Sequence, residues 1–484
     1  MKCSLSTEPN PVVDERHPVL IGKKVPLIIG AALFMQTMDG HSIATILPVA
    51  AETFGTNPVA LNVAITVYFA AAAAFLPVSG WFADRFGTRV VFQGAIVAFL
   101  IGSAICALAP SAPVLFMGRA VQGMAGAGLL PVGRLLIIRT ARKRDLMEQL
   151  TYLTLPPLLG PMIGPVLAGA AGTFGSWRWI FILNLPIGLI GLYLIGRFVP
   201  QVREQSVPAL DWRGAILSSL FFVSIVLLLN ELSHGGTIAS ASPLLTIAAL
   251  SGGGYIFHAG RVANPILDLS LFRIPTYSAG TIGGVFVRLS IGAEPFLYAL
   301  LFQVTLGLTA FISGLLIATT SVGMMVMRSL SVRIIRMFGF RQILIFTTIA
   351  GTVTLAVPLL FDRSTPLVAI AAYLALRGLV RSTQLNAVNA ITYADPPRDK
   401  ASAASSLAAT IQQICQGGGT ALAASLIAWL PMFSTLEQPQ AIRLALPALG
   451  LVGLISLVYF GRLRDDAGAN LSGRGRNPEQ QPEG

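Results

Sequence analysis

The chain has 484 residues, of which 54% are hydrophobic and 11% are charged. Soluble domains carry about 25% charged residues, so this composition excludes an ordinary soluble protein and predicts one embedded in a lipid bilayer. The net charge of +12 could suit a nucleic-acid-binding protein. We exclude that class because the basic residues lie in short clusters between apolar stretches, as they do in the loops of membrane proteins.

Fourteen apolar stretches approach or exceed the roughly 20 residues that a helix needs to cross a bilayer. The predicted spans are 25–50, 59–80, 90–109, 114–138, 149–171, 179–198, 214–231, 242–260, 277–302, 308–328, 341–361, 366–387, 402–429 and 441–461. Lysine and arginine are concentrated on the side that holds both termini, which predicts that this side is cytoplasmic. We therefore expect an all-α integral membrane protein.

The first span carries a carboxylate, Asp39, near the middle of the membrane. Helical spacing places Gln36 and Ser42 beside it at i−3 and i+3, which makes a polar stripe on an apolar helix. A charge at that depth costs about 2.5–3.5 kcal/mol on insertion scales. Asp39 should therefore face a cavity, pair with a cation or be protonated. Its role is either in proton coupling or substrate binding, or in a purely structural ion pair.

The loop between the second and third spans, residues 80–89, reads GWFADRFGTR. Gly80 and Gly87 allow a sharp turn and close backbone approach, and the loop places Asp84, Arg85 and Arg89 at the membrane surface. By themselves these residues could form an ordinary basic turn.

The fourth span buries a basic residue, Arg119, with Gln122 on the same helical face at i+3. Gly123 and Gly126 follow at i+4 and i+7 and allow another helix to approach closely. Arg119 is either part of a functional site or a structural cation.

The fifth span repeats small residues at every fourth position, Gly160, Gly164 and Ala168, which makes a flat face for helix packing. Pro161 and Pro165 each remove a backbone donor and bend the helix. Close packing together with a bend suits a helix that rocks against a neighbour. The alternative is a tightly packed, bent helix with a purely structural role.

The ninth span carries Arg288 and Glu294. Six residues correspond to about 600° of helical turn, so the two side chains point in different directions and are not expected to pair with each other. Glu294 is a second candidate for a proton site. The alternative is a structural carboxylate whose charge another partner satisfies.

Four stretches of the sequence together resemble a known family. Residues 80–89 resemble the loop between helices 2 and 3 of the major facilitator superfamily, although Phe82 and Thr88 depart from its pattern. The Arg-x-x-Gln-Gly pattern at 119–123 and the Gly-Pro-x-x-Gly pattern at 160–164 resemble motifs of that superfamily's drug:proton antiporters. The string at 177–188, WRWIFILNLPIG, resembles a signature of the fourteen-span branch, with a structural role.

This resemblance implies a fold of two six-helix bundles with two extra central helices. The expected domains are a cytoplasmic tail at 1–24, bundles at 25–198 and 277–464, a linker with the extra helices at 199–276 and a cytoplasmic tail at 465–484. A weak copy of the loop 80–89 at 338–341, Phe-Gly-Phe-Arg, agrees with two related halves. Arg377 then occupies the place in the second half that Arg119 has in the first.

The same resemblance implies the function of a bacterial multidrug resistance transporter. The chain is expected to export small amphipathic compounds across the cytoplasmic (inner) membrane by alternating access, in exchange for protons and without a cofactor. Asp39 and Arg119 would face the cavity between the bundles, with Arg119 tuning the proton affinity of a nearby carboxylate. The loop 80–89 would act as a conformational latch. An uptake transporter or one that is not coupled to protons is the alternative.

An enzyme is not expected. The four histidines form no His-Glu-x-x-His pair, and the sequence contains neither a Gly-x-Ser-x-Gly pattern nor a phosphate-binding Walker loop. The three cysteines have no metal or disulfide spacing. The expected partners are a small-molecule substrate, protons and the lipid bilayer, with no nucleic acid and no metal, and the expected state is a monomer.

Overall fold

The computed structural model describes residues 23–142, 145–204, 207, 209–233, 238–262, 265–397, 400–432, 436–465 and 467–468. These residues are almost entirely helical, and no strand occurs among them. The two expected tails lie almost wholly outside the described ranges. Ten of the described helices are long and apolar enough to cross a membrane. The prediction of an all-α membrane protein is confirmed.

The helices follow the predicted spans in order. The first six are α1 Lys24–Phe54, α2 Val63–Phe86 with the short η1 Ala60–Asn62 before it, α3 Thr88–Ala107, α4 Ala112–Thr140, α5 Leu146–Phe174 and α6 Trp179–Phe198. Next come α7 Trp212–Ser233, α8 Ile238–Ala259 and η2 Leu269–Arg273. The rest are α9 Pro275–Ser278, η3 Ala279–Gly283, α10 Gly284–Leu300, η4 Leu301–Thr305, α11 Ala310–Phe338, α12 Phe340–Ala356, η5 Val357–Leu360, α13 Leu367–Thr392, α14 Ala401–Trp429, η7 Leu430–Met432, α15 Gln438–Leu454 and α16 Ser456–Phe460.

Two tight turns share one backbone geometry. Gly87 separates α2 from α3 with φ +92°, and Gly339 separates α11 from α12 with φ +81°. Residues with a Cβ atom rarely adopt such positive φ values, so a glycine is needed at both places. The similar sequences of the two loops therefore reflect the same turn at equivalent positions of the two helix groups.

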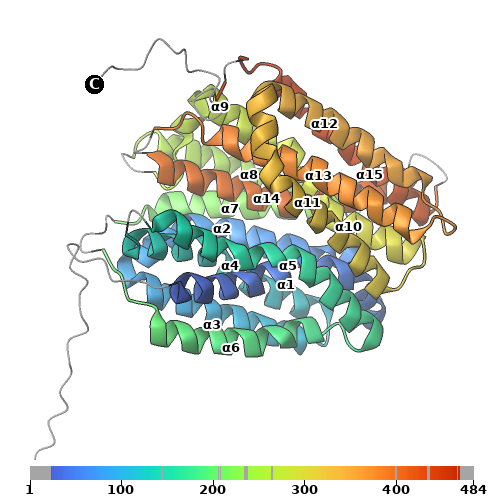
Figure 1. Ribbon diagram of the computed structural model, residues 1–484, viewed down its shortest axis with the longest axis horizontal. Coiled ribbons are helices and arrows are strands. Elements are labelled where there is room, and N and C mark those ends of the chain that lie inside the picture. The colour runs from blue at the N-terminus through green and yellow to red at the C-terminus, as the bar shows by residue number, and fades with distance from the viewer. Residues whose placement is uncertain are drawn as a thin grey trace, which may run out of the picture.

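The helices pack in two groups. Helices α1–α6, which we name the first bundle, pack mainly with one another, and α10–α16, the second bundle, do the same. Helices α7 and α8 pack together as a pair, and α7 lies between α2 and α14 (Figure 1). On the other side of the molecule α5 packs against α11. The two bundles therefore meet along these contacts and enclose a space between them.

The connection after α8 is fastened to the start of α14. Lys400 Nζ donates to Asp268 Oδ2 at 2.8 Å and to Ser270 Oγ at 2.8 Å. Burial acts to raise the pKa of the Asp268 carboxyl, but the hydrogen bonds from Lys400 and Ser270 outweigh it and hold that pKa below its usual value. These two hydrogen bonds join the segment that follows α8 to the second bundle.

Candidate functional site

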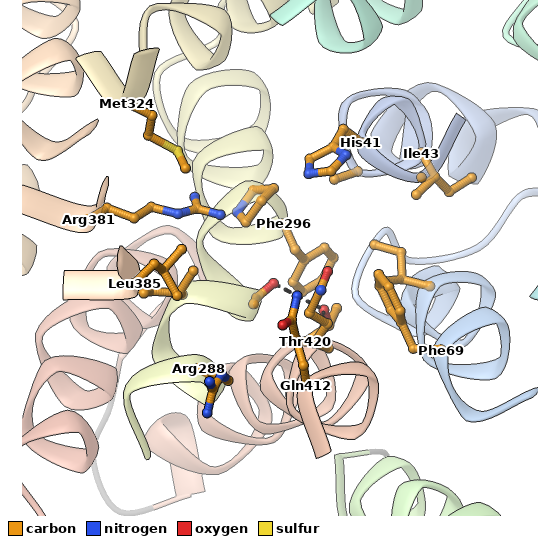
Figure 2. Close-up of a pocket in the computed structure, with 17 residues that line it drawn as sticks. His41, Ile43, Phe69, Arg288, Phe296, Met324, Arg381, Leu385, Gln412 and Thr420 are labelled. Carbon is orange, nitrogen blue, oxygen red and sulfur yellow. Dashed lines mark hydrogen bonds between the residues drawn. The ribbon is translucent and has the colours of Figure 1, made fainter. Parts of the chain in front are cut away.

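A cavity lies between the two bundles. It consists of two adjoining parts of about 240 Å³ and about 590 Å³, which share Gly40, His41, Phe69, Gln412 and Gln416. Its walls come from α1, α2, α4 and α5 of the first bundle and from α10, α11, α13 and α14 of the second. We name this joined space the central cavity. Figure 2 shows His41 on α1 and Arg381 on α13 reaching into it from opposite sides.

The central cavity leads to the end of the molecule that carries the loop 80–89. Its larger part is lined by Arg134 near the end of α4, Tyr393 just after α13 and Ser405 in the first turns of α14. All three lie at the same end of the bundles as the end of α2. A solute could therefore reach the cavity from that end.

The opposite end of the molecule is closed by contacts between the bundles. Gln303 Nε2 donates to the Thr45 carbonyl at 2.9 Å, and the Phe311 amide donates to Thr173 Oγ1 at 2.9 Å. The ring of Phe174 packs edge-on against Phe311 with centroids 5.4 Å apart. A structure that is open at one end and closed at the other is one of the two forms that alternating access requires.

The first bundle contains a buried ion pair. Arg119 Nη1 on α4 lies 2.5 Å from Asp39 Oδ2 on α1, and both side chains are almost completely buried. Asp39 Oδ1 accepts a second hydrogen bond from Asn184 Nδ2 at 2.8 Å and a third from Gln122 Nε2 at 3.3 Å. Gln122 in turn donates to Ser103 Oγ at 2.8 Å. The carboxyl group is therefore contacted by one cation and two amides, the kind of surroundings that make a buried charge tolerable.

This pair does not line the central cavity described above. Asp39 and Arg119 were expected to face it, but in this conformation they lie behind its wall and point into the first bundle. Tyr68 lies between them and the cavity: it lines the larger part, and its ring centroid is 4.3 Å from Arg119 Cζ. Tyr68 therefore contacts both the central cavity and the buried pair.

The second bundle contains a matching ion pair. Arg377 Nη2 on α13 donates to Glu294 Oε1 on α10, and both side chains are buried. Helices α10 and α13 are the first and fourth long helices of the second bundle, as α1 and α4 are of the first. The other oxygen, Glu294 Oε2, makes no hydrogen bond and lies 3.7 Å from Arg381 Nη1. Glu294 is therefore less completely satisfied than Asp39.

Arg288 lines the cavity and, as expected, does not pair with Glu294. Its Nη1 donates to the Gly280 carbonyl at 2.9 Å and its Nη2 to Asn389 Oδ1 at 3.0 Å. Of the six residues predicted for the proton and substrate site, the structure places Asp39, Arg119 and Gln122 in one cluster and Glu294 and Arg377 in another. Arg288 is the member of the set that lines the central cavity.

The loop 80–89 is fastened within the first half of the chain. Arg139 Nη2 bridges Asp84 Oδ1 at 2.8 Å and Glu204 Oε1 at 2.7 Å. The Arg89 amide donates to Gln201 Oε1 at 3.0 Å, and its guanidinium donates to the Gly196 carbonyl. These contacts join the loop to α4, to the end of α6 and to the segment that follows it. A latch to the second bundle remains a prediction for the other conformation.

Pro161 and Pro165 of α5 each leave a carbonyl group without its helical donor, and both carbonyls accept hydrogen bonds from other helices. Pro161 has no N–H for the Pro157 carbonyl, which accepts instead from Thr37 Oγ1 of α1 at 3.1 Å. Pro165 has none for the Pro161 carbonyl, which accepts from Ser321 Oγ of α11 at 3.0 Å. The first bond lies within the first bundle and the second joins the two bundles.

Glycines of α5 and α11 allow close packing at the same two interfaces, α5 with α1 and α5 with α11. A Cβ atom on Gly160 would come within 2.2 Å of Thr37 Oγ1, and one on Gly164 within 2.6 Å of the Met38 carbonyl, so both hold α5 against α1. A Cβ atom on Gly314 of α11 would come within 2.1 Å of the Pro165 carbonyl. Helix α5 thus packs closely against its own bundle on one face and against the other bundle on the other.

The string 177–188 contributes to the site as well as to the fold. Trp177 is buried, with 2% of its surface exposed, and donates to Thr53 Oγ1 at 3.1 Å, whereas Trp179 is 55% exposed. Trp177 therefore packs inside the first bundle, and Trp179 lies on its surface. Asn184, for which only a structural role was expected, donates directly to Asp39.

Three further residues of the site were not singled out from the sequence. Arg381 lies four residues after Arg377, a spacing that places the two on one helical face and could have revealed it. His41 is an ionisable residue at membrane depth, a signal that could have revealed it, whereas nothing local distinguishes Tyr68 from the other residues of α2. Their places in the cavity follow from the rotation of α1 and α2, which their neighbours decide.

Comparisons with known proteins agree with this architecture. A model of the Major Facilitator Superfamily matches residues 29–420. A protein of Salmonella paratyphi A named "Putative multidrug resistance protein MdtD" is 33% identical over 410 residues, which cover 83% of this chain and 85% of the relative. A protein of the same name from Serratia proteamaculans is 32% identical over 455 residues and covers 92% of this chain and 94% of its own.

Solved structures share the fold at low sequence identity. A POT family transporter in complex with 5-aminolevulinic acid matches with a TM-score of 0.66 and 15% identity, over 91% of this chain and 96% of its own. A bacterial homolog of the human lysosomal transporter Spinster, in an inward-facing and unoccupied conformation, matches with a TM-score of 0.62 and 15% identity, over 95% and 98%. The chain is therefore a multi-pass membrane transporter rather than an enzyme, and it belongs to the Major Facilitator Superfamily.

Proposed function

We propose that this transporter exports small amphipathic compounds from the cytoplasm in exchange for protons. The observation that carries the proposal is the buried ion pair of Asp39 and Arg119, joined through Tyr68 to a cavity between two bundles. Proton exchange requires an acid that changes its protonation state as the cavity changes sides. A carboxylate at membrane depth, with a single cation that can leave it, has the chemistry for this task.

The proton step would work through the packing of the first bundle. When Asp39 is charged, its hydrogen bonds tie α1 to α4 and α6. A proton on Asp39 removes the attraction to Arg119 and leaves that guanidinium with the Ala64 carbonyl, Gln122 and the ring of Tyr68. Because a lone buried charge is unfavourable by several kcal/mol, the helices have a reason to repack. The protonated and charged forms would favour different openings of the cavity.

Glu294 is the second candidate for the proton site. It has a free oxygen near the cavity wall, whereas Asp39 has none. Variants at the two positions distinguish the candidates. Proton release should be lost only when the carboxylate that carries the proton is replaced.

The experiment uses everted membrane vesicles that contain the protein and have an acidified lumen. In a screen with host cells that lack other exporters, compounds whose accumulation falls on expression identify a substrate. Adding that compound to the vesicles should release protons from the lumen, which a pH-sensitive dye reports. The single change Asp39→Asn leaves Arg119 unpaired and should destabilise the fold by about 3–5 kcal/mol, so the double variant Asp39→Asn, Arg119→Gln is the informative one.

The double variant should fold and bind the compound but release no protons. The matched control removes an exposed ion pair, Lys23 and Glu148, whose charged atoms lie 3.0 Å apart. The change Lys23→Gln, Glu148→Gln should leave proton release unchanged. Normal proton release by the Asp39→Asn, Arg119→Gln variant would reject Asp39 as the carrier. If the double variant Glu294→Gln, Arg377→Gln, chosen for the same reason, then loses proton release, the role passes to Glu294.

The proposal includes an orientation and a location. We place the protein in the cytoplasmic (inner) membrane of a bacterium, with both termini and the loop 80–89 in the cytoplasm, which the distribution of basic residues supports. The cavity in this structure would then be open to the cytoplasm, where an exporter collects its substrate. The protein would work as a monomer and need no cofactor, because the proton gradient supplies the driving force.

Export is favoured over uptake by the α5 motif, which resembles that of antiporters. Uptake, or transport without protons, remains the alternative function. The same vesicle assay distinguishes them: proton-coupled uptake acidifies the lumen rather than releasing protons from it, and uncoupled transport moves the compound with no change in lumen pH.

A further inference from the structure

The central cavity has an excess of positive charge. Arg288 is 4% exposed and, within the described chain, has no carboxylate partner. Its contacts are the Gly280 carbonyl and the Asn389 side chain, both neutral, and its Nε makes no hydrogen bond. A buried cation with neutral partners alone is unfavourable by several kcal/mol. Such a residue is retained where a further anion completes the site.

Arg381 is also short of negative charge. It shares one carboxylate, Glu294, with Arg377, which holds that carboxylate by a direct hydrogen bond. The Arg381 contact, at 3.7 Å between Nη1 and Oε2, is too long to be a hydrogen bond, and its Nε has no partner either. Arg377, Arg381 and Arg288 together bring three positive charges against one negative charge. A net charge of +2 is left beside the cavity.

Nothing else in the lining compensates for this charge. Among the described residues, no aspartate or glutamate lines either part of the cavity. The other polar groups there are amides and hydroxyls such as Gln412, Gln416 and Thr420, together with His41, which faces Arg381 from α1 (Figure 2). Arg134 adds a further positive charge toward the opening. The cavity therefore attracts anions and repels cations along its whole length.

Much of the remaining wall of the smaller part is apolar. Ile43, Phe69, Ile291, Phe296 and Leu385 line the smaller part, next to the arginines. A cavity of a few hundred Å³ with an apolar wall and a few polar anchors is typical of sites for small organic molecules. A fully inorganic anion would use the arginines but leave this apolar surface in contact with water.

We propose that the central cavity binds amphipathic organic anions, with the carboxylate of the substrate held by Arg381, the positive charge of Arg288 adding to the attraction for the anion, and the apolar body of the substrate packed against α1, α2 and α10. This inference rests on the proposed function only in taking the cavity as the substrate site. It divides the two tasks between the bundles: the Asp39 cluster of the first handles the proton, and the arginines of the second bind the substrate. An inside-negative membrane potential would further favour expulsion of an anion.

The test measures binding to the purified full-length protein in detergent, with no gradient present. The probes are aromatic acids of increasing size, beginning with 1-naphthaleneacetate, each compared with its neutral amide and with the amine of the same ring. Isothermal titration calorimetry gives the affinities. We expect at least one acid to bind roughly tenfold or more tightly than its amide, and no amine to bind better than its acid.

The variants Arg288→Gln and Arg381→Gln should each weaken binding of the acid by roughly tenfold or more and leave binding of the amide unchanged. Arg381→Lys keeps the charge and should retain most of the affinity. The matched control Arg336→Gln removes an exposed arginine of α11 that does not line the cavity, and should change nothing. Size-exclusion chromatography confirms that each variant is folded.

The proposal is overturned if no acid binds more tightly than its amide, or if both glutamine variants bind the acids like the unchanged protein. Should the glutamine variants fail to fold, the comparison of acid, amide and amine on the unchanged protein decides alone. Failure of the proposed proton exchange looks different: anions would still bind selectively, but vesicles would release no protons. Proton release driven by an amine, with no binding of acids, would leave antiport standing and reject the anion site.

Discussion

At the scale of single residues, the two buried carboxylates differ in how completely their charge is compensated. Asp39 accepts from Arg119, Asn184 and Gln122, so both of its oxygens are used. Glu294 accepts from Arg377 through one oxygen, while the other makes no hydrogen bond. Equivalent positions in the two bundles thus hold one carboxylate whose hydrogen bonds are complete, a closed network, and one with an unused oxygen, an open network. A closed network defines a single packing of its helices, whereas an open one can accept a further partner.

Asn184 is predicted to support the Asp39 network. The change Asn184→Ala removes one of three donors to a buried carboxylate and should lower the free energy of unfolding by about 1–3 kcal/mol. It should also reduce proton-coupled transport more strongly than substrate binding, because the substrate does not touch this residue. Thermal melting in detergent and the vesicle proton-release assay measure the two effects.

A control for Asn184→Ala lies on the same helix. Gly191→Ala on α6 adds a methyl group where no atom lies within 4 Å, so it should change neither stability nor transport. If Asn184→Ala behaves like this control in both measurements, its hydrogen bond to Asp39 has no bearing on the proton step.

At the scale of elements, α5 is the helix that joins the two bundles at the closed end. Its prolines expose carbonyl groups that α1 and α11 bond through Thr37 and Ser321. Its glycines, and Gly314 opposite them, let the helix axes come close. Backbone contacts of this kind involve few long side chains, so they can separate and form again with little side-chain reordering. That property suits a contact that must open in every transport cycle.

Gly314→Ala is predicted to weaken the closed end. The added Cβ atom would meet the Pro165 carbonyl at 2.1 Å, and because the obstacle is backbone the helices must move apart. Overpacking of this kind costs about 1–3 kcal/mol, which shifts the population toward a form that is open at this end. Cross-linking between cysteines placed at Asn57 and Gln438, whose side chains lie 3.4 Å apart across the bundles, should fall.

The same cross-link in a protein with Gly253→Ala provides the comparison. That glycine, on α8, has no atom within 4 Å of an added Cβ, so cross-linking should stay at its starting level. Equal cross-linking in both variants would show that the contact between α5 and α11 does not control closure.

At the scale of the whole molecule, the structure holds one of the two states that transport requires. The central cavity leads to the end with the loop 80–89, and inter-bundle contacts close the other end. In this state Asp84 is paired with Arg139 of its own bundle. The predicted latch must therefore form when the molecule closes at the loop end, where the second bundle approaches.

Asp84→Asn is predicted to slow the cycle without preventing substrate binding. The carboxylate would be lost from the closed form of the loop end, so that form should be less populated, while the cavity residues remain unchanged. Substrate exchange in proteoliposomes should fall several-fold while the affinity in detergent stays constant. Exchange at the unchanged rate would exclude a role as a latch. Glu204→Gln, which removes the other acidic partner of Arg139, is the matched control and should preserve exchange.

Much of the architecture follows from the sequence because the bilayer restricts what an apolar stretch can do. A stretch of about 20 apolar residues in lipid must satisfy its own backbone hydrogen bonds and therefore forms a helix. The positions of the helices, the glycine turns at Gly87 and Gly339 and the separate directions of Arg288 and Glu294 were all predictable from spacing. So was the small-residue face of α5, because glycines and prolines act through the backbone of their own helix.

The rotation of each helix about its axis was decided only by the tertiary structure. Asp39 and His41 are two residues apart, which is about 200° of turn, so if one faces the cavity the other cannot. The sequence favoured Asp39 for the cavity, but packing of α1 against α4 and α6 turns Asp39 inward and His41 toward the cavity. The same long-range packing selects Asn184 as a partner of Asp39. Contacts between residues distant in the chain depend on every helix at once, and no local pattern records them.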